Sequence, residues 1–189
     1  EPEEGELFYD DFSDGSTAGY AVYDKENTGA DIAAEESLNV SFGAAPYDWN
    51  EKNGIRKDIT ELAETESKYS VSADVYSSYW NGVTAKVFFE IEGTDGTRRI
   101  DIAENVLETN EGTVTVSGTA DLRFGDGEKV YLCITQAAGY QSYDNIKMVY
   151  AGKADPAPIE TIPAPTREPE DGELFYDDFS DGSTAGYAV

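Results

Sequence analysis

Aromatic residues in polar surroundings are the side chains of this sequence best suited to binding chemistry. Trp49 lies in APYDWNEKNG and Trp80 in SSYWNG, and both segments have the composition of loops. A flat ring can stack against the C–H groups of a sugar, while neighbouring amide, hydroxyl or charged groups bond the sugar hydroxyls. Exposed aromatic residues need such a reason. The alternative is that each tryptophan caps the core, and the sequence favours the two interpretations equally.

Further candidates adjoin the tryptophans in sequence or fall at outward positions of predicted strands. Tyr76, Phe88 and Tyr131 are of the second kind, although capping the core is the favoured role of Tyr76 or Phe88 taken alone. Stacking is expected of the tryptophans and Tyr131, and hydrogen bonding of the polar members. The predicted sugar-binding set is Tyr47, Trp49, Arg56, Tyr76, Tyr79, Trp80, Asn81, Tyr131 and Gln136.

Catalysis is not expected from this composition. The chain has no histidine, which excludes Ser-His and Cys-His nucleophiles as well as histidine metal ligands. Carboxylate pairs of the kind that glycosidases use carry no information among 39 acidic residues. No glycine-rich motif lies between a predicted strand and a helix, so a phosphate-binding loop is not expected either.

The balance of charge restricts the partners. The 39 acidic residues outnumber 13 basic ones and give a formal net charge of −26. Nucleic-acid phosphates and anionic membrane surfaces would be repelled, so we expect neither as a partner. A neutral ligand, a cation or simple solubility fits better. The single Cys133 excludes an intrachain disulfide, and no apolar stretch reaches the roughly 18 residues of a membrane span.

Strands must position these side chains, because apolar and polar residues alternate along much of the chain. The inward rows predicted in residues 68–76, 83–92 and 129–135 are Tyr69, Val71, Ala73 and Val75; Val83, Ala85, Val87, Phe89 and Ile91; and Val130, Leu132 and Ile134. Further strands are predicted at residues 6–12, 20–23, 38–42, 98–102, 113–117 and 144–150, with one helical turn near residues 58–64. Eight to ten short antiparallel strands predict an all-β fold, a two-sheet antiparallel β-sandwich of the jelly-roll type.

The sequence contains a copy of its own first segment. ELFYDDFSDGSTAGYAV occurs at residues 6–22 and again at 173–189, and the match extends leftward to 22 positions with one change, Glu4 against Asp171. The segment before the second copy is rich in proline, threonine and acidic residues, which predicts a stiff linker. We therefore expect an acidic linker end at residues 1–5, a domain at 6–152, a linker at 153–172 and the start of a tandem copy at 173–189.

The two copies are chemically equivalent, so they compete for one place in the sheet. We expect the second copy, residues 173–189, to pair with a neighbouring molecule or to displace the first, as in domain swapping. The repeat also predicts adjacent identical modules, in which weak binding sites gain by avidity.

A family resemblance rests on three stretches. Residues 37–76, SLNVSFGAAPYDWNEKNGIRKDITELAETESKYSVSADVY, resemble the carbohydrate-binding modules of the family 4, 9 and 22 group. YLCITQAAGYQSYDNIKMVY at 131–150 looks like the closing pattern of these modules, and LFYDDFSDGSTAGYAVY at 7–23 resembles their opening element. The resemblance implies a non-catalytic jelly roll that is attached to polysaccharide-degrading enzymes or cell-surface scaffolds.

The resemblance also implies roles for single residues. Trp49 matches the ligand-stacking tryptophan of these modules, and Tyr131 matches a ligand-contacting tyrosine. Cys133 stands where family 22 xylan binders carry a glutamate that bonds the sugar. Xylan, β-glucan, mannan and starch therefore all stay open as ligands.

A structural Ca²⁺ between the first and last strands is a further implication of the resemblance. Ca²⁺ prefers several carboxylate oxygens, and YDDFSDG offers Asp10, Asp11 and Asp14. Alternation places Asp144 on the inward row with Ile146 and Met148, where an unpaired carboxylate is costly. The predicted calcium ligands are Asp11, Asp14 and Asp144. The alternative is that Asp144 lies exposed at a strand end and accepts hydrogen bonds from turn N–H groups.

These features together predict a non-catalytic carbohydrate-binding module. We expect it to be one of tandem repeats in a secreted or cell-surface bacterial protein, with a plant cell-wall glycan or starch as its partner. The rival hypothesis is a calcium-stabilised spacer or adhesin repeat that has no sugar ligand. Solvent exposure of Trp49 and Trp80 favours the first, and their burial favours the second.

Overall fold

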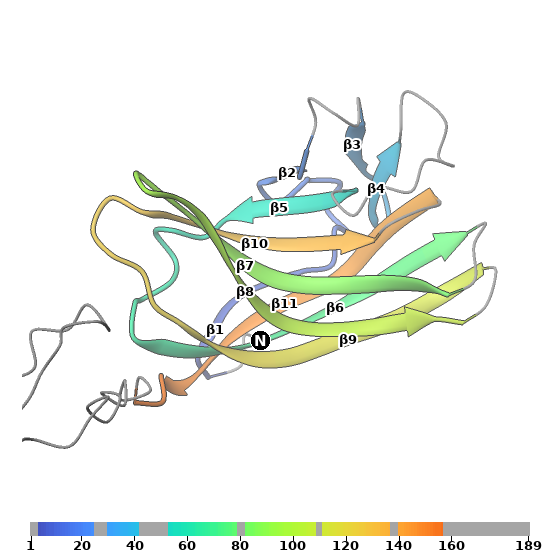
Figure 1. Cartoon of the computed structure of the whole chain (residues 1–189). Helices are drawn as coiled ribbons and strands as arrows, with labels where there is room; N and C mark the ends of the chain where they lie inside the picture. Colours follow the sequence, from blue (N-terminus) through green and yellow to red (C-terminus); the bar gives the residue numbers. More distant parts are fainter. Residues whose placement is uncertain are drawn as a thin grey trace, which may run out of the picture. The chain divides into compact units, whose positions relative to one another are not determined.

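Eleven β-strands carry the regular structure of the described residues (Figure 1). The structure is a computed structural model, which describes residues 4–24, 30–41, 53–78, 82–108, 111–136 and 140–156. The chain divides into two compact units, Glu1–Asp155 and Pro156–Val189, and all eleven strands belong to the first. Within the described segments, no helix has the length and the apolar content that crossing a membrane requires.

The strands form two antiparallel sheets. The six-stranded sheet has the order β3-β4-β11-β6-β9, with β1 also paired to β11, and the five-stranded sheet has the order β2-β5-β10-β7-β8. The first contains β1 (Glu6–Asp10), β3 (Asp31–Ala34), β4 (Leu38–Ser41), β6 (Ser67–Ser78), β9 (Glu111–Leu122) and β11 (Tyr140–Lys153). The second contains β2 (Tyr20–Val22), β5 (Gly54–Asp58), β7 (Val83–Gly93), β8 (Gly96–Leu107) and β10 (Lys129–Gln136). The predicted two-sheet β-sandwich is confirmed.

The hydrophobic core lies between the two sheets. Every residue of the inward rows predicted for β6, β7 and β10 is buried, so period-2 alternation identified these rows correctly. The first segment of the chain contributes Phe12 and Tyr20, whose rings meet edge-on at 5.8 Å between centroids. The last strand contributes Tyr143, Ile146 and Met148.

The strands are more numerous and longer than predicted. β3 and β5 were not expected, and the three strands β8, β9 and β11 extend to 12, 12 and 14 residues. Most residues of β8 and β9 are polar or exposed. The length of these strands is therefore determined by backbone pairing, of β8 with β7 and of β9 with β6, and not by burial of apolar side chains. The predicted helical turn is a single turn after β5, in which the N–H groups of Leu62 and Ala63 donate to the carbonyl oxygen of Ile59.

A β-bulge in β11 overturns the predicted orientation of Asp144. The pairing of β11 with β6 shifts between Asp144 and Lys147, and Asn145 adopts a left-handed φ of 49°. The extra residue lets Tyr143 and Ile146 both point into the core. Asp144 therefore lies on the outer face of the six-stranded sheet, opposite Asp74, rather than inward with Ile146 and Met148.

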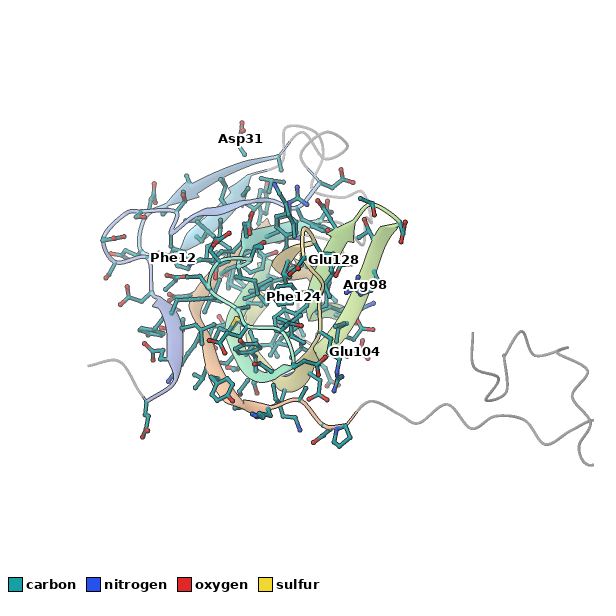
Figure 2. All side chains as sticks on the ribbon, turned by 90° about the vertical axis from the view of Figure 1, so that its left-hand side faces the viewer. Phe12, Asp31, Arg98, Glu104, Phe124 and Glu128 are labelled. Atoms are coloured by element: carbon teal, nitrogen blue, oxygen red, sulfur yellow. The ribbon has the colours of Figure 1, made fainter. Side chains whose placement is uncertain are left out.

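A bidentate ion pair ties the β7–β8 hairpin to the connection between β9 and β10. Arg98 of β8 donates to both carboxylate oxygens of Glu128, one of them from Nη2 at 2.8 Å (Figure 2). The hydrogen bond from Arg98 lowers the pKa of Glu128 to about 2, with the backbone N–H of Gly125 assisting. This contact fixes the end of the sheet nearest the hairpin.

The pairing of β5 with β10 requires glycine at position 54. A Cβ on Gly54 would lie 2.2 Å from the carbonyl oxygen of Ile134 and 2.7 Å from the Cα of Thr135. Both contacts are with backbone, which cannot give way without separating the strands. The close approach thus holds β5, and the site residues on it, against β10.

We predict that Gly54→Ala lowers the free energy of unfolding by about 2 kcal/mol, because overpacking must push β5 away from β10. Urea unfolding of the purified variant measures this loss. Gly125→Ala is the matched control, since its added Cβ meets only Glu128 Oε2 at 3.7 Å, and it should change stability by less than about 0.5 kcal/mol. Equal effects of the two substitutions would contradict the prediction.

Candidate functional site

The outer face of the five-stranded sheet gathers aromatic and charged side chains in two rows. This face is defined by the residues of β5, β10, β7 and β8 that point away from the core. The strand register places outward side chains of adjacent strands next to one another, in rows that run across the sheet. One row is Arg56, Cys133, Phe88 and Asp101, and the next is Asp58, Tyr131, Glu90 and Arg99.

A small apolar cluster lies in the middle of this face. Phe88, Tyr131 and Cys133 are buried although alternation points them outward, and they form a cluster separate from the core. Tyr23, which follows β2, packs edge-on against Phe88 at 5.8 Å between ring centroids. Burial raises the pKa of the Cys133 thiol well above its ordinary value, and Glu90 adds to the shift. Cys133 is therefore a neutral packing residue.

Two arginine side chains cover the aromatic rings of the cluster. The Cζ atom of Arg99 lies 3.6 Å from the centre of the Phe88 ring, and Cζ of Arg56 lies 4.4 Å from the centre of the Tyr131 ring. A guanidinium plane over a ring gains cation–π attraction and removes the ring from water. Tyr131 consequently has only 9% of its surface exposed. The face presents guanidinium groups to solvent where the predicted stacking ring would be.

Carboxylates hold these guanidinium groups in place, and Arg99 Nε donates to Asp101 Oδ1. Arg56 Nη1 donates to Glu92 Oε1 at 2.9 Å and lies 3.7 Å from Glu90 Oε1. Glu90 also accepts a hydrogen bond from the Tyr23 hydroxyl, and burial followed by this bond raises the pKa of Tyr23. Glu90 is almost fully buried, so it needs these partners. The result is an ordered network of donors and acceptors.

A polar hollow of about 350 Å³ continues the face across β7 and β8. It is lined by Lys86, Arg99, Asp101, Ile102, Ala103 and Glu104. Its volume is at the lower end of the range for small-molecule sites. Two cations and two carboxylates are among the lining residues, with Glu104 on the outer strand β8 (Figure 2). This hollow offers several hydrogen-bonding groups next to the covered aromatic cluster.

The structure brings together only part of the predicted sugar-binding set. Arg56 and Tyr131 meet on the outer face of the five-stranded sheet, as their ring contact shows. Tyr76 lies on the outer face of the other sheet, where its hydroxyl donates to Glu111 Oε1 at 2.8 Å. Gln136 lies on the core-facing row of β10 and is 2% exposed. Tyr47, Trp49, Tyr79, Trp80 and Asn81 lie outside the described residues.

The predicted set omitted several residues of this face and its surroundings, among them Tyr23, Glu90, Glu92 and Arg99. Glu90 could have been found from the sequence, because it lies two residues from Phe88 and therefore points to the same outer face of the predicted strand. The contacts of Tyr23 and Arg99 with Phe88 depend on which strands are neighbours, and the sequence alone does not determine that order.

The predicted calcium ligands accept hydrogen bonds from residues one or two positions further along the chain. Asp11 Oδ1 accepts from the N–H and hydroxyl of Ser13, which lowers the pKa of Asp11. Asp14 Oδ1 accepts from the N–H of Ser16, and Asp144 Oδ1 from the N–H of Asn145. Among the described residues, no three acidic, cysteine or histidine side chains lie close enough together to hold a metal ion. The carboxylates as placed do not form a ligand set.

This chain is similar to known proteins in its fold, and no similarity was found at the level of sequence families. No protein-family model and no curated protein sequence matches the chain. Among solved structures, the CBM22-2 xylan-binding domain of Paenibacillus barcinonensis Xyn10C matches with a TM-score of 0.63 and 11% identity, over 77% of this chain and 99% of that one. The C-terminal family 22 carbohydrate-binding module of Clostridium thermocellum Xyn10B matches with a TM-score of 0.63 and 15% identity, over 82% and 100%.

A third match includes a bound sugar in its description. The CBM22-1–GH10 modules of Clostridium thermocellum xylanase Xyn10B, complexed with xylohexaose, match with a TM-score of 0.62 and 13% identity, over 79% of this chain and 29% of that one. The chain has the fold of the jelly-roll carbohydrate-binding modules. At these identities the likeness concerns the fold alone.

The calcium site stays a prediction that a melting experiment can test. Partial burial raises the pKa of Tyr9, and the charges of Asp11, Asp144 and Asp74 add to the shift. If an ion joins Asp11 and Asp144, its removal by EDTA should lower the Tm by about 5 °C or more, because an ion bound only by the folded state stabilises that state. Calorimetry with and without added Ca²⁺ measures the shift. An unchanged Tm in EDTA would contradict the prediction.

Proposed function

We propose that this chain is a non-catalytic carbohydrate-binding module that binds a plant polysaccharide on the outer face of the five-stranded sheet. The observation that carries the proposal is the pair of guanidinium groups over two buried aromatic rings, with Glu90 and Glu92 beside Arg56 and Asp101 beside Arg99. Guanidinium groups donate hydrogen bonds, and carboxylates accept them. A fixed set of both kinds is suited to the hydroxyl groups of a neutral sugar.

The matched structures support a choice of first ligand. One is described as a xylan-binding domain, and another as a complex with xylohexaose. Xylan is therefore the first candidate, and β-glucan, mannan and starch are the alternatives. Neutral glycans are also compatible with a net charge of −26, which would repel a polyanion.

The mechanism we propose differs from simple stacking on Tyr131. Arg56 covers the ring of Tyr131, so the sugar would meet the guanidinium plane first. Glu90 lies on β7, directly opposite Tyr131 of the neighbouring strand β10, which also carries Cys133. We assign to Glu90 the hydrogen bonding that the resemblance gives to a glutamate at the position of Cys133. Stacking is left to Trp49 and Trp80.

A spacer without a sugar ligand is the second candidate, because one observation favours it. Phe88 and Tyr131 are both buried, and a buried aromatic cluster stabilises a sandwich without any ligand. In a spacer the arginines would serve only to cover this cluster. The two candidates differ in whether the charged network binds sugar, which binding experiments resolve.

We further propose that the module is exported by a bacterium and works beside identical copies of itself. The repeated segment at residues 173–189 supports adjacent modules. Two linked weak sites that engage one polysaccharide together bind more tightly than either alone. Mass spectrometry of the separated culture fractions would test its export: the full protein is expected in the medium or at the cell surface.

Affinity gel electrophoresis tests the sugar-binding proposal. The protein is run through gels that contain xylan, β-glucan, mannan, pectin or starch. We expect retardation by a neutral polysaccharide, xylan first. Retardation should not decrease between about 50 and about 500 mM salt, because a neutral ligand releases no counterions. This range extends on both sides of the roughly 100–150 mM at which surface charges are strongly screened. Retardation in none of the gels would favour the spacer.

Substitution of Arg56 tests the site. We predict that Arg56→Ala weakens binding of the retarding polysaccharide at least about tenfold, which corresponds to about 1.4 kcal/mol. Arg123→Ala is the matched control, because Arg123 is 32% exposed against 31% for Arg56 and also pairs with a glutamate, Glu66. Isothermal titration calorimetry measures both, and circular dichroism verifies folding. Equal binding by the two variants would place the site elsewhere.

A further inference from the structure

The first segment of the chain, residues 5–22, lies only on sheet edges. Its strand β1 pairs with β11, and its strand β2 pairs with β5 at the end of the five-stranded sheet. In the described residues, no strand pair elsewhere depends on either of them. The segment can therefore leave without disrupting the rest of the strand order, and it leaves behind a slot bounded by β11 and β5.

The contacts in this slot come from two short stretches of the remaining chain. Lys57 Nζ lies 2.7 Å from Asp10 Oδ2, and 4.1 Å from the centre of the Phe8 ring. The N–H of Tyr150 donates to the carbonyl oxygen of Gly5 at 2.8 Å, and the hydroxyl of Tyr9 donates to Asn145 at 2.5 Å.

Apolar burial completes the set of contacts. Three side chains of the first segment enter the core and are at most 6% exposed: Phe12, Tyr20 and Val22. Loss of these side chains would uncover one side of the core, so an empty slot is costly.

A second segment in the chain carries the same groups in the same order. Residues 172–189 are identical to residues 5–22 at all eighteen positions. Phe179 corresponds to Phe12, Tyr187 to Tyr20 and Asp177 to Asp10. Every contact just described is therefore available to the second segment without any change of side chain.

The direction of β11 makes the slot reachable from within the same chain. β1 runs antiparallel to β11, with Glu6 opposite Val149, so the slot begins where β11 approaches its end. An antiparallel neighbour can follow directly as a hairpin. Residue 156 is six positions beyond Tyr150, which is at most about 22 Å of chain, and the fifteen residues 157–171 can span about 50 Å. The linker is long enough to return.

We infer that residues 172–189 are an alternative occupant of the slot of residues 5–22 in the same molecule. The slot accepts one segment at a time, and the two bound forms have the same side-chain contacts. In a tandem array, the first segment of each module can by the same logic complete the module before it. The inference rests on the repeat and the described contacts, and it is independent of sugar binding.

A double-mutant cycle in the full chain tests the inference. Phe12→Asp disables the first segment and Phe179→Asp the second, since Phe12 is 2% exposed in the core. Aspartate tolerates the left-handed φ of 54° at Phe12, so the substitution acts through burial of a charge. We expect each single variant to melt within about 2 °C of the unmodified protein, because the intact segment fills the slot. The double variant should lose about 10 °C or more.

Two results would overturn the inference. In the first, Phe12→Asp alone melts as low as the double variant, which would mean that the second segment does not substitute for the first. In the second, all three variants melt like the unmodified protein, which would mean that the slot does not need this side chain. Sedimentation of Phe12→Asp gives a further check: we expect a monomer, and a dimer would show exchange between molecules instead.

Discussion

Strand β10 is buried on both of its faces, and the rest of the structure depends on that constraint. Its inward residues, Leu132 and Ile134 among them, form the middle of the core. Its outward residues Tyr131 and Cys133 are also withdrawn from water. A strand in this position must be paired on both edges, and β5 and β7 supply those pairs. The second buried face then needs a cover, which the sandwich has no third layer to provide.

Arginine side chains supply the cover, and this solution shapes the candidate site. A guanidinium group can lie flat on a ring and still keep its N–H groups available to solvent or carboxylates. Arg56 on β5 and Arg99 on β8 approach the apolar cluster from opposite sides of β10 and β7. Their carboxylate partners orient them. The same residues that protect the cluster from water therefore present an ordered hydrogen-bonding surface.

The sequence predicted the fold better than the site. Alternation in residues 68–76, 83–92 and 129–135 located the inward rows, because one-sided burial has a period of two. The orientation of Asp144 was wrong, because the left-handed Asn145 adds a residue that no hydrophobic pattern records. β5 was missed because charged residues occupy much of GIRKD. Arg56 belonged to the predicted site and the outward position of Glu90 could be read from alternation, whereas the contact of Arg99 with Phe88 required the order of the strands.

The central claim is that sugar binds the outer face of the five-stranded sheet, and amide chemical-shift mapping tests it most directly. Xylohexaose, and then gluco- and manno-oligosaccharides, would be titrated into the uniformly ¹⁵N-labelled protein. The largest shifts are expected at Arg56, Phe88, Glu90 and Tyr131, with none at Ser72, Asp74 and Thr115 on the outer face of the other sheet. Shifts concentrated on the six-stranded sheet, or no shifts with any of the sugars, would contradict the claim.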